Sequence, residues 1–501
     1  MKRVASVVAL CVASWSFIFA QVGPPQGAPP PPAQGRQGGA PSPPQGRTPD
    51  LELLKQFDQD KNGWLNLTER TAARVRIAEL RAGRGGRGAS VATPVEPGPR
   101  MTPADVQNHP GKPLYDPATL RTVFLDFPDA GWEEDMEAFY HTDIEVPATM
   151  RVDGKSYPNV GLQFRGNSSF FSVARGRKRS LSVSVDHVNA DQRLEGYSDL
   201  TFLNAHSDPT FLRSMVYLDM VRQYLPALKA NYMRVVINGE SWGVYVNQQR
   251  FNRDFLRDAF GTQDGIRFKS SNRSRFGSFS YLGDSIDEYR KWYEIQSADR
   301  DASWKVLMNV TRVLAQTPTE GLKAAIEPIF NVDGALRYLA LDMVVMSGDG
   351  YWLHGSDFNL YVDTKGVLHI LHHDTNEAFT TASSGPAAAG GRGGGPREAK
   401  ADPVGYMDDV NKALRNKLLA VPEYRTKYLQ YIHHIATNAL DWAKIGPKVA
   451  AYRALIRADV EADTRKLYPT AEFTETVIKD FIEERRAYLL AHPDVIAAGR
   501  K

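Results

Sequence analysis

The sequence predicts an α+β fold of two lobes with a cleft between them, preceded by a short helical unit. Strand-like runs are frequent as far as Val246, as in Val160–Phe164, Leu181–Val185 and Met233–Ile237. Helical periodicity dominates from about Trp304 to the end of the chain. A β-rich portion followed by a mainly helical one is typical of two packed lobes.

Composition narrows the class of protein. The chain has 501 residues, of which 42% are hydrophobic, so it can bury one large core or two moderate ones. Its formal net charge of +3 is small for this length, so charge does not indicate a nucleic-acid-binding protein. No stretch after the first twenty residues is long and apolar enough to predict a membrane span.

The first residues have the pattern of a secretory signal peptide. Lys2 and Arg3 precede a mostly apolar run that ends at Phe19, and Ala20 is a suitable last residue before cleavage. A retained N-terminal anchor is the alternative. The only cysteine, Cys11, lies inside this segment. We therefore expect a secreted or periplasmic protein whose mature chain, after cleavage, has no thiols, disulfides or cysteine metal ligands.

Composition shifts divide the chain into five parts. A Pro/Gly-rich segment with few apolar residues is typical of a flexible tether, and a Gly/Arg stretch that becomes Pro-rich is typical of a linker. A further low-complexity segment, 380–400, predicts a surface loop beside the cleft. The predicted boundaries are 1–20 for the signal peptide, 21–50 for a linker, 51–80 for a helical unit, 81–113 for a second linker and 114–500 for the main domain.

A calcium-binding loop is predicted within the helical unit. Residues 58–69, DQDKNGWLNLTE, match the EF-hand loop at every diagnostic position, with Gly63 at the sharp turn. The alternative is a loop that keeps the pattern but binds weakly. The predicted Ca²⁺ ligands are Asp58, Asp60, Asn62, the carbonyl of Trp64, Asn66 and Glu69.

An acid, an amide and a second acid occur in the order that phosphoryl transfer uses. They are Asp349, Asn359 and Asp374. In protein kinases a catalytic-loop acid accepts the hydroxyl proton, and an amide and a later acid hold the metal ions. Two strand-like runs, Asn359–Val362 and Val367–His373, are joined by a tight turn that would bring Asn359 and Asp374 towards each other. The segment therefore predicts a kinase-like site.

Two other kinds of enzyme are less consistent with the residues. Strand alternation places His372 and Asp374 on one face and the other two side chains on the opposite face, which disfavours a transition-metal site made of His369, His372, His373 and Asp374. Ser168 or Ser169 as a hydrolase nucleophile lacks the elbow motif of that class.

Several motifs in order resemble the CotH kinase family, the spore coat protein H type of atypical secreted kinase, over nearly all of residues 114–500. The resemblance implies a two-lobed, atypical protein-kinase-like fold. It also implies that ATP, with Mg²⁺ or Mn²⁺, donates a phosphate to an unknown protein substrate. The motifs are Val160–Ser169 (VGLQFRGNSS), Lys178–Leu181 (KRSL), Asn204–Arg213 (NAHSDPTFLR), Asn238–Tyr245 (NGESWGVY) and Gly265–Lys269 (GIRFK).

The resemblance also assigns roles to residues. Asp349 corresponds to the catalytic acid, Asp374 to the metal-binding acid and Asn359 to a second metal-site position. A Gly/Ser turn lets backbone N–H groups approach phosphate oxygens, and a lysine on the next strand can neutralise them. The implied nucleotide-binding residues are Arg165, Gly166, Asn167, Ser168, Ser169 and Lys178.

Three positions depart from the family pattern. Gln249 stands where the family has a glutamate, His373 where it has a tryptophan and Asn376 where it has a second acid. Gln249 and Asn376 keep a second interpretation open, a non-catalytic kinase-fold surface or adhesion protein with a calcium-binding EF-hand. We interpret the nearby Asp342 and Asp357 as structural, hydrogen-bonding groups.

Overall fold

A computed structural model describes most of the chain. The described residues are 51–82, 95–270, 278–348, 350–380, 399–405 and 407–500. The predicted signal peptide, the first linker and most of the loop at 380–400 lie outside them. Within these ranges, every helix is too short or too polar to cross a membrane.

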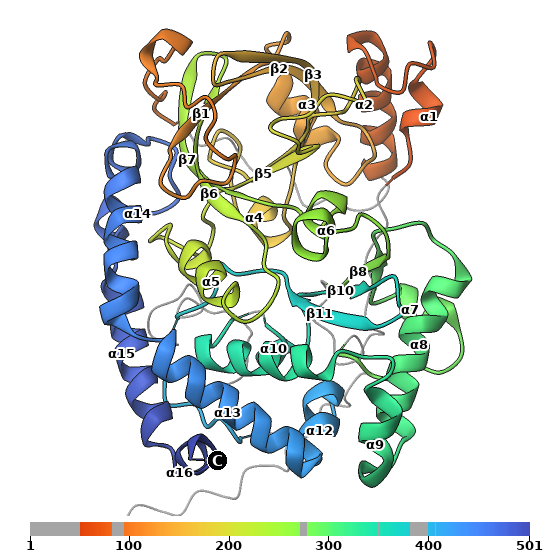
Figure 1. Ribbon diagram of the computed structural model, residues 1–501. Coiled ribbons are helices and arrows are strands. Elements are labelled where there is room, and N and C mark those ends of the chain that lie inside the picture. Colours follow the sequence, from red (N-terminus) through yellow and green to blue (C-terminus); the bar gives the residue numbers. More distant parts are fainter. Residues whose placement is uncertain are drawn as a thin grey trace, which may run out of the picture. The chain divides into compact units, whose positions relative to one another are not determined.

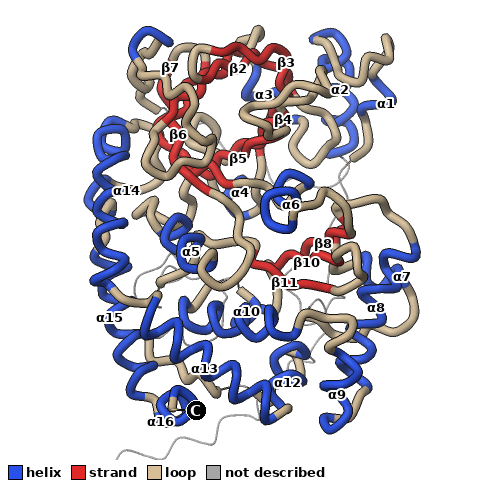
Figure 2. The backbone as a smooth tube through the Cα atoms, in the orientation of Figure 1, coloured by secondary structure: helices blue, strands red, loops and turns tan. Residues whose placement is uncertain are grey.

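Seven strands form a closed barrel (Figures 1 and 2). Their order is β1-β2-β3-β4-β5-β7-β6, and the parallel pairing of β1 with β6 closes it, with Arg121 opposite Met233. The strands are β1 (Arg121–Asp126), β2 (Val146–Val152), β3 (Lys155–Phe164), β4 (Leu181–Ser184), β5 (Asp199–Leu203), β6 (Ala230–Ile237) and β7 (Glu240–Gln248).

The strands predicted within this region are confirmed. Val160–Phe164 is the second half of β3, Leu181–Val185 contains β4 and Met233–Ile237 lies in β6. Val160 and Leu162 are fully buried inside the barrel, as alternation along a strand requires.

A second, antiparallel sheet has the order β11-β10-β8-β9. Its strands are β8 (Ile266–Ser270), β9 (Glu294–Ile295), β10 (Phe358–Val362) and β11 (Leu368–His372). The β10–β11 pair is the hairpin predicted from the sequence, and its turn is closed by a hydrogen bond of 2.9 Å from the N–H of Asp363 to the carbonyl of Val367. Helix α10 (Val332–Val345) contacts β11 and is buried almost all round, as expected of a central helix.

Most of the remaining helices build a second core around α10, whereas α3 and α4 pack into the barrel core. The prediction of a mainly helical C-terminal portion is confirmed, with the β10–β11 hairpin inserted in it. These helices are α3 (Trp132–Ala138), α4 (Ser168–Phe171), α5 (Arg213–Val221), α6 (Arg253–Phe260), α7 (Ile286–Arg290), α8 (Asp301–Gln316), α9 (Thr319–Ile326), α11 (Tyr351–His354), α12 (Ala413–Ala420), α13 (Pro422–Asn438), α14 (Trp442–Ala462), α15 (Thr476–Ala491) and α16 (Pro493–Gly499), with short 3₁₀ turns at Pro103–Asp105 and Thr470–Glu472.

The N-terminal helical unit packs on the barrel. Its helices are α1 (Leu54–Phe57) and α2 (Leu67–Ala82), and Leu53, Leu65, Ala73 and Ile77 belong to the barrel's own hydrophobic core. Arg70, almost fully buried, forms ion pairs with Asp129 at 2.5 Å and Asp135 at 3.0 Å. The unit and the barrel therefore share one core.

The predicted linker 81–113 divides into two parts. Residues 83–94 lie outside the described ranges, whereas 95–113 run along the barrel. The N–H of Ser241 donates to the carbonyl of Pro99 at 2.9 Å, and the N–H of Met101 donates to the carbonyl of Gly239 at 3.0 Å. Backbone hydrogen bonds of this kind hold a Pro-rich segment that has no hydrophobic periodicity.

Candidate functional site

One face of the four-stranded sheet carries polar side chains. Lys269 of β8 lies opposite Asn359 of β10 on one side and opposite Glu294 of β9 on the other. Residues directly opposite each other in a sheet point to the same face, so these three side chains share it. Asn359 is 1% exposed and donates to the carbonyl of His372 at 3.2 Å, while its Oδ1 has no partner among the described residues.

Arg165 reaches the same region from the barrel. It follows β3, and its backbone N–H donates to the carbonyl of Ser180 at 3.0 Å. Burial and the charge of Arg250 lower the pKa of Arg165 to about 10, while the carboxylate of Asp374 acts in the opposite direction. Its guanidinium forms no hydrogen bond or ion pair with any described residue.

Lys269 and Arg165 are close enough to repel each other. Burial lowers the pKa of Lys269, and the positive charge of Arg165 lowers it further, whereas Glu294, Asp357 and Asp374 oppose the shift. Within the described ranges the ammonium of Lys269 also has no hydrogen bond or ion pair. Two partly buried cations that pair with no described carboxylate form a site that an anion would stabilise.

His373 stands beside this cation pair. Burial, together with the charges of Lys269 and Arg165, lowers the pKa of His373 well below its ordinary value, so the imidazole is neutral at physiological pH. Its Nδ1 is buried without a hydrogen-bond partner in the described structure. The residue in the family's tryptophan position therefore offers a polar ring edge next to the two cations.

The turn after β11 carries the predicted metal-binding acid. Asp374 is exposed and accepts a hydrogen bond of 2.8 Å from the N–H of Thr375. Asn376 donates to the carbonyl of His206 at 2.8 Å, which ties the turn to the barrel. The amide in the second-acid position thus has a structural contact, and Asp374 is the carboxylate of this turn that lies among the cations.

The Gly/Ser turn after Arg165 has a backbone that requires glycine. Gly166 has φ of 88°, and a Cβ at this position would lie 2.0 Å from Oγ of Ser169. Its carbonyl accepts a hydrogen bond from the hydroxyl of Tyr140. The carbonyl of Asn167 accepts the N–H groups of Phe170 and Phe171 at 3.1 Å, and Gly166 and Asn167 are exposed.

Ser169 lies half-buried in the same turn. The side chain of Ser168 lies outside the described structure.

Lys178 has a different environment from the one expected of a phosphate ligand. Its ammonium is fully buried, pairs with Asp463 at 2.6 Å and lies 4.6 Å from the ring centre of Tyr245. Asp463 ends α14, so this ion pair joins the barrel to the C-terminal helices. Removal of one partner from a buried pair leaves an uncompensated charge, which typically costs about 3–5 kcal/mol of stability.

Asp349 is outside the described residues, but its surroundings are defined. Asp342 of α10 is 1% exposed, and its carboxylate accepts the N–H of Trp352 at 2.5 Å at the start of α11. Burial raises the pKa of Asp342 to about 7. The geometry agrees with the structural role predicted for Asp342.

The histidines of β11 do not converge on one point. His369 contacts Asp363 at 3.1 Å, whereas His372 is buried against Tyr217 and Tyr338, and burial lowers the pKa of His372 to about 3. This arrangement follows the alternation expected of a strand. Among the described residues, the transition-metal alternative therefore has no set of converging ligands.

The sequence did not predict three features of the site: the shared face of two cations on β8, the contacts of Gln249 and the ion pair of Lys178. Arg267 and Lys269 alternate along β8, a pattern that would have placed both on one face. Gln249, in the family's glutamate position, donates to Asp258 at 2.9 Å and accepts the N–H of Lys229 at 3.2 Å. No local signal could have paired Lys178 with a carboxylate 285 positions away.

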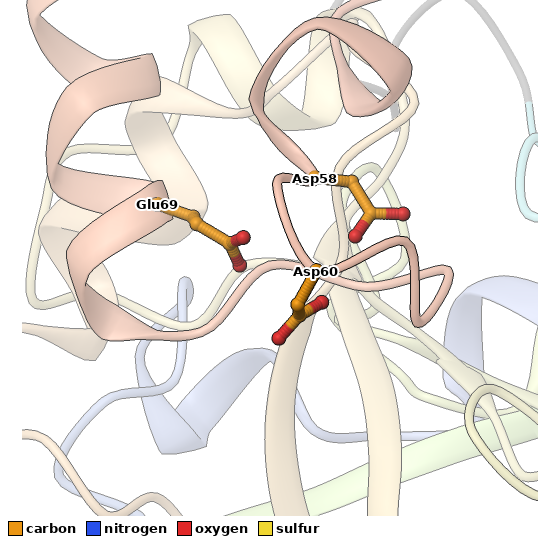
Figure 3. Close-up of side chains that lie close together, drawn as sticks. All are labelled: Asp58, Asp60 and Glu69. Atoms are coloured by element: carbon orange, nitrogen blue, oxygen red, sulfur yellow. The ribbon is translucent and has the colours of Figure 1, made fainter.

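The calcium loop has converging carboxylates (Figure 3). Asp58, Asp60 and Glu69 each offer an oxygen, and these atoms lie within 4.8 Å of one another. Opposed ligands of Ca²⁺ lie about 4.6–5.2 Å apart, twice the usual Ca–O distance, so the three oxygens fit around one ion. Gly63 has φ of 88° at the sharp turn, and Asn66 accepts the N–H groups of Thr68 and Glu69.

Comparison with known proteins identifies the class. A family model described as CotH kinase protein matches residues 162–489, more than half of the chain. This protein therefore belongs to the CotH kinase family. The mixed α+β architecture, a seven-stranded barrel followed by a helical region, is consistent with that family.

Two curated relatives come from Rhizopus delemar. The chain is 25% identical over 269 residues to a protein named Invasin CotH7, covering 51% of this chain and 42% of the relative. It is 24% identical over 276 residues to one named Spore coat protein homolog 1, covering 51% of this chain and 41% of the relative. The chain thus spans less than half the length of either relative.

Proposed function

We propose that this protein is an extracytoplasmic kinase that transfers the γ-phosphate of ATP to hydroxyl groups of another protein, with Mg²⁺ or Mn²⁺. Family membership supports the general activity. The observation that carries the proposal is the pair of cations Arg165 and Lys269, which form no ion pair with any described residue and lie beside the exposed carboxylate of Asp374. Cations that hold phosphates and an acid that holds the metal ion are the parts that phosphoryl transfer requires.

In this proposal the cations and the acid of the site hold different ligands. Arg165 and Lys269 would hold phosphate oxygens, and Asp374 would hold the metal ion, with Oδ1 of Asn359 as a further oxygen near it. In this proposal Lys269 takes the role that the sequence assigned to Lys178, because Lys178 is already neutralised by Asp463. The bound metal ion neutralises charge on the transferred phosphoryl group.

Asp349 is proposed as the acid that accepts the substrate hydroxyl proton. We expect Asp349→Asn to reduce phosphate transfer by about a hundredfold or more while nucleotide binding stays near the wild-type level, because a positioned base acts on the chemical step. Labelled ATP with intact-mass and phosphosite analysis measures transfer, and calorimetry measures binding. Asp357→Asn is the matched control. Its backbone has φ of 54°, a conformation that asparagine tolerates. Full activity of Asp349→Asn with loss in the control would assign the role to Asp357.

A second candidate function is a non-catalytic surface or adhesion protein. It is favoured by Asn376, which is bound to the carbonyl of His206, and by the name Invasin carried by one relative. Absence of nucleotide binding under every metal condition would support this alternative.

We also propose that the loop at residues 58–69 binds Ca²⁺ and stabilises the whole chain. Glu69 is 4% exposed, and the next residue, Arg70, pairs with Asp135 of α3, so an ion held by Glu69 would reinforce the contact between α2 and the barrel. A ligand that binds only the folded state adds about 2.7 kcal/mol of stability at a hundredfold excess over its Kd.

We therefore expect Ca²⁺ to raise the melting temperature of the full chain, and Glu69→Gln to remove most of that rise. Glu79→Gln on the same helix is the control, because Glu79 is exposed and lies outside the loop. Calorimetric titration supplies the direct measurement. A lack of calcium-dependent heat at millimolar ion, where weak extracellular sites still bind, would disprove the calcium site.

A further inference from the structure

Three arginines extend outward from the cation pair. Arg250 follows β7, Arg253 is the first residue of α6 and Arg267 lies in β8, and we call these three the outer basic strip. Burial lowers the pKa of Arg267, and the charges of Arg253 and Arg250 lower it further, with Asp199 opposing. The guanidinium of Arg267 is therefore close enough to be repelled by those of Arg253 and Arg250.

The acids around the strip compensate it only weakly. Arg250 lies 3.7 Å from Asp199, which also accepts a hydrogen bond of 2.6 Å from Asn252. Arg267 donates to a backbone carbonyl, that of Phe251 at 2.9 Å. The exposed side chain of Arg253 has no hydrogen bond or ion pair within the described part of the chain.

The strip is continuous with the proposed phosphate site. Arg250 donates to the hydroxyl of Ser182 at 3.3 Å, two residues after Ser180, whose carbonyl accepts the N–H of Arg165 at 3.0 Å. The charge of Arg250 also lowers the pKa of Arg165. Exposure rises outward, from half-buried Arg165 through Arg250, whose side chain is 44% exposed, to exposed Arg253. Weakly compensated like charges that lead from a binding site to solvent are disfavoured in the free chain, and an acidic partner would relieve their repulsion.

We propose that the outer basic strip binds an acidic segment of the protein that receives the phosphate. This inference rests on the proposed kinase function and specifies its substrate class, a serine or threonine flanked by Asp, Glu or phosphorylated residues. The nucleotide itself is not the preferred ligand of the strip, because its phosphates would be held by Arg165 and Lys269 beside Asp374. Arg253 lies at the other, solvent-exposed end of the strip, on α6. The strip would hold the acceptor by charge and leave its hydroxyl near Asp374.

The test uses the full chain and two synthetic peptides that share one serine, flanked by glutamates in one and by lysines in the other. We expect kcat/KM at least tenfold higher for the glutamate peptide, with a preference that shrinks at high salt. Arg253→Glu should lower kcat/KM for that peptide about tenfold without changing KM for ATP. The variant should fold, because a glutamate at the first position of a helix is favourable. Arg457→Glu, an exposed arginine on α14 with no ion pair in the described structure, is the control and should have no effect.

A binding readout separates this inference from the kinase proposal. Fluorescence anisotropy with a labelled glutamate-rich peptide that lacks serine should show binding to the wild type and about tenfold weaker binding to Arg253→Glu. Peptide binding without any phosphate transfer would overturn the kinase proposal and keep the acidic-partner surface. Equal use of the two peptides would overturn the inference. A raised KM for ATP with unchanged peptide use, or tighter binding of a polynucleotide than of the peptide, would also overturn it by assigning the strip to another ligand.

Discussion

Lys269→Met is expected to weaken nucleotide binding about tenfold to a hundredfold while leaving the free protein at least as stable as the wild type. A hydrogen bond to a charged group contributes about 1.5–3 kcal/mol, and each 1.4 kcal/mol is about a factor of ten in affinity. Without a ligand, however, the ammonium is repelled by Arg165 and disfavoured by burial, both of which lower the pKa of Lys269.

The sign of the stability effect follows from that shift. A lysine whose pKa is lower in the folded chain than in the unfolded one destabilises the fold at every pH below the folded pKa, and this penalty disappears as the pH rises to the ordinary value of 10.5. Methionine keeps much of the side-chain volume and removes the charge, so the penalty is lost. A gain or no change in stability together with a loss of affinity is typical of a residue retained for binding.

Calorimetry with ADP and Mn²⁺, and thermal melts without ligand, measure the two effects. Lys305→Met on α8 is the matched control, because Lys305 is exposed and distant in the sequence from the cation pair. Lys178→Met is expected to give the opposite pattern, with lower stability and little direct effect on affinity, because it removes the ammonium that neutralises the buried carboxylate of Asp463. Unchanged affinity in Lys269→Met, or a large loss in Lys178→Met at full stability, would return the phosphate role to Lys178.

Asp374→Asn is expected to abolish the metal dependence of nucleotide binding and to lower transfer by about a hundredfold or more. The acid lies near Arg165 and Lys269, and carboxylate oxygens are the ligands that Mg²⁺ and Mn²⁺ prefer. An asparagine can still accept the N–H of Thr375 through its amide oxygen, so the turn should keep its shape. Nucleotide should then stabilise the wild type only in the presence of metal, and should stabilise the variant little under any condition.

Thermal melts with and without ATP and Mn²⁺ measure this effect. Asp357→Asn is again the appropriate comparison, because Asp357 is the other nearby carboxylate that acts on Lys269 from the same stretch of sequence. A wild-type metal response in Asp374→Asn would show that another group holds the ion. Loss of the response in Asp357→Asn alone would identify that group.

The barrel strands and the β10–β11 hairpin could be predicted because alternation and turn residues are local. Val160 and Leu162 show the alternation of buried residues, and Asp363 is the turn residue whose N–H forms the hydrogen bond that closes the hairpin. Residues 95–113 have no such local pattern, because they pack on the barrel through backbone hydrogen bonds. Composition alone therefore placed this segment in a linker.

One part of the candidate site could be predicted from the sequence, the β10–β11 hairpin with Asn359 on one strand and Asp374 after the other, whereas Asp349 lies outside the described residues. The hydrogen bond from Asn359 to the carbonyl of His372 joins the two strands. The choice between Lys178 and Lys269 depends on which ammonium meets a carboxylate in the folded chain. That pairing is set by packing between distant elements, and the sequence contains no sign of it.

Phosphate transfer itself is measured by incubation of the purified chain with γ-labelled ATP and Mn²⁺, followed by intact-mass analysis of wild type and Asp374→Asn. We expect metal-dependent incorporation of labelled phosphate into the wild type or an added acidic protein, and its loss in the variant. Labelled phosphate in neither protein, with no nucleotide-dependent change in melting temperature at any metal concentration, would disprove the kinase proposal and favour a binding protein that retains the kinase fold.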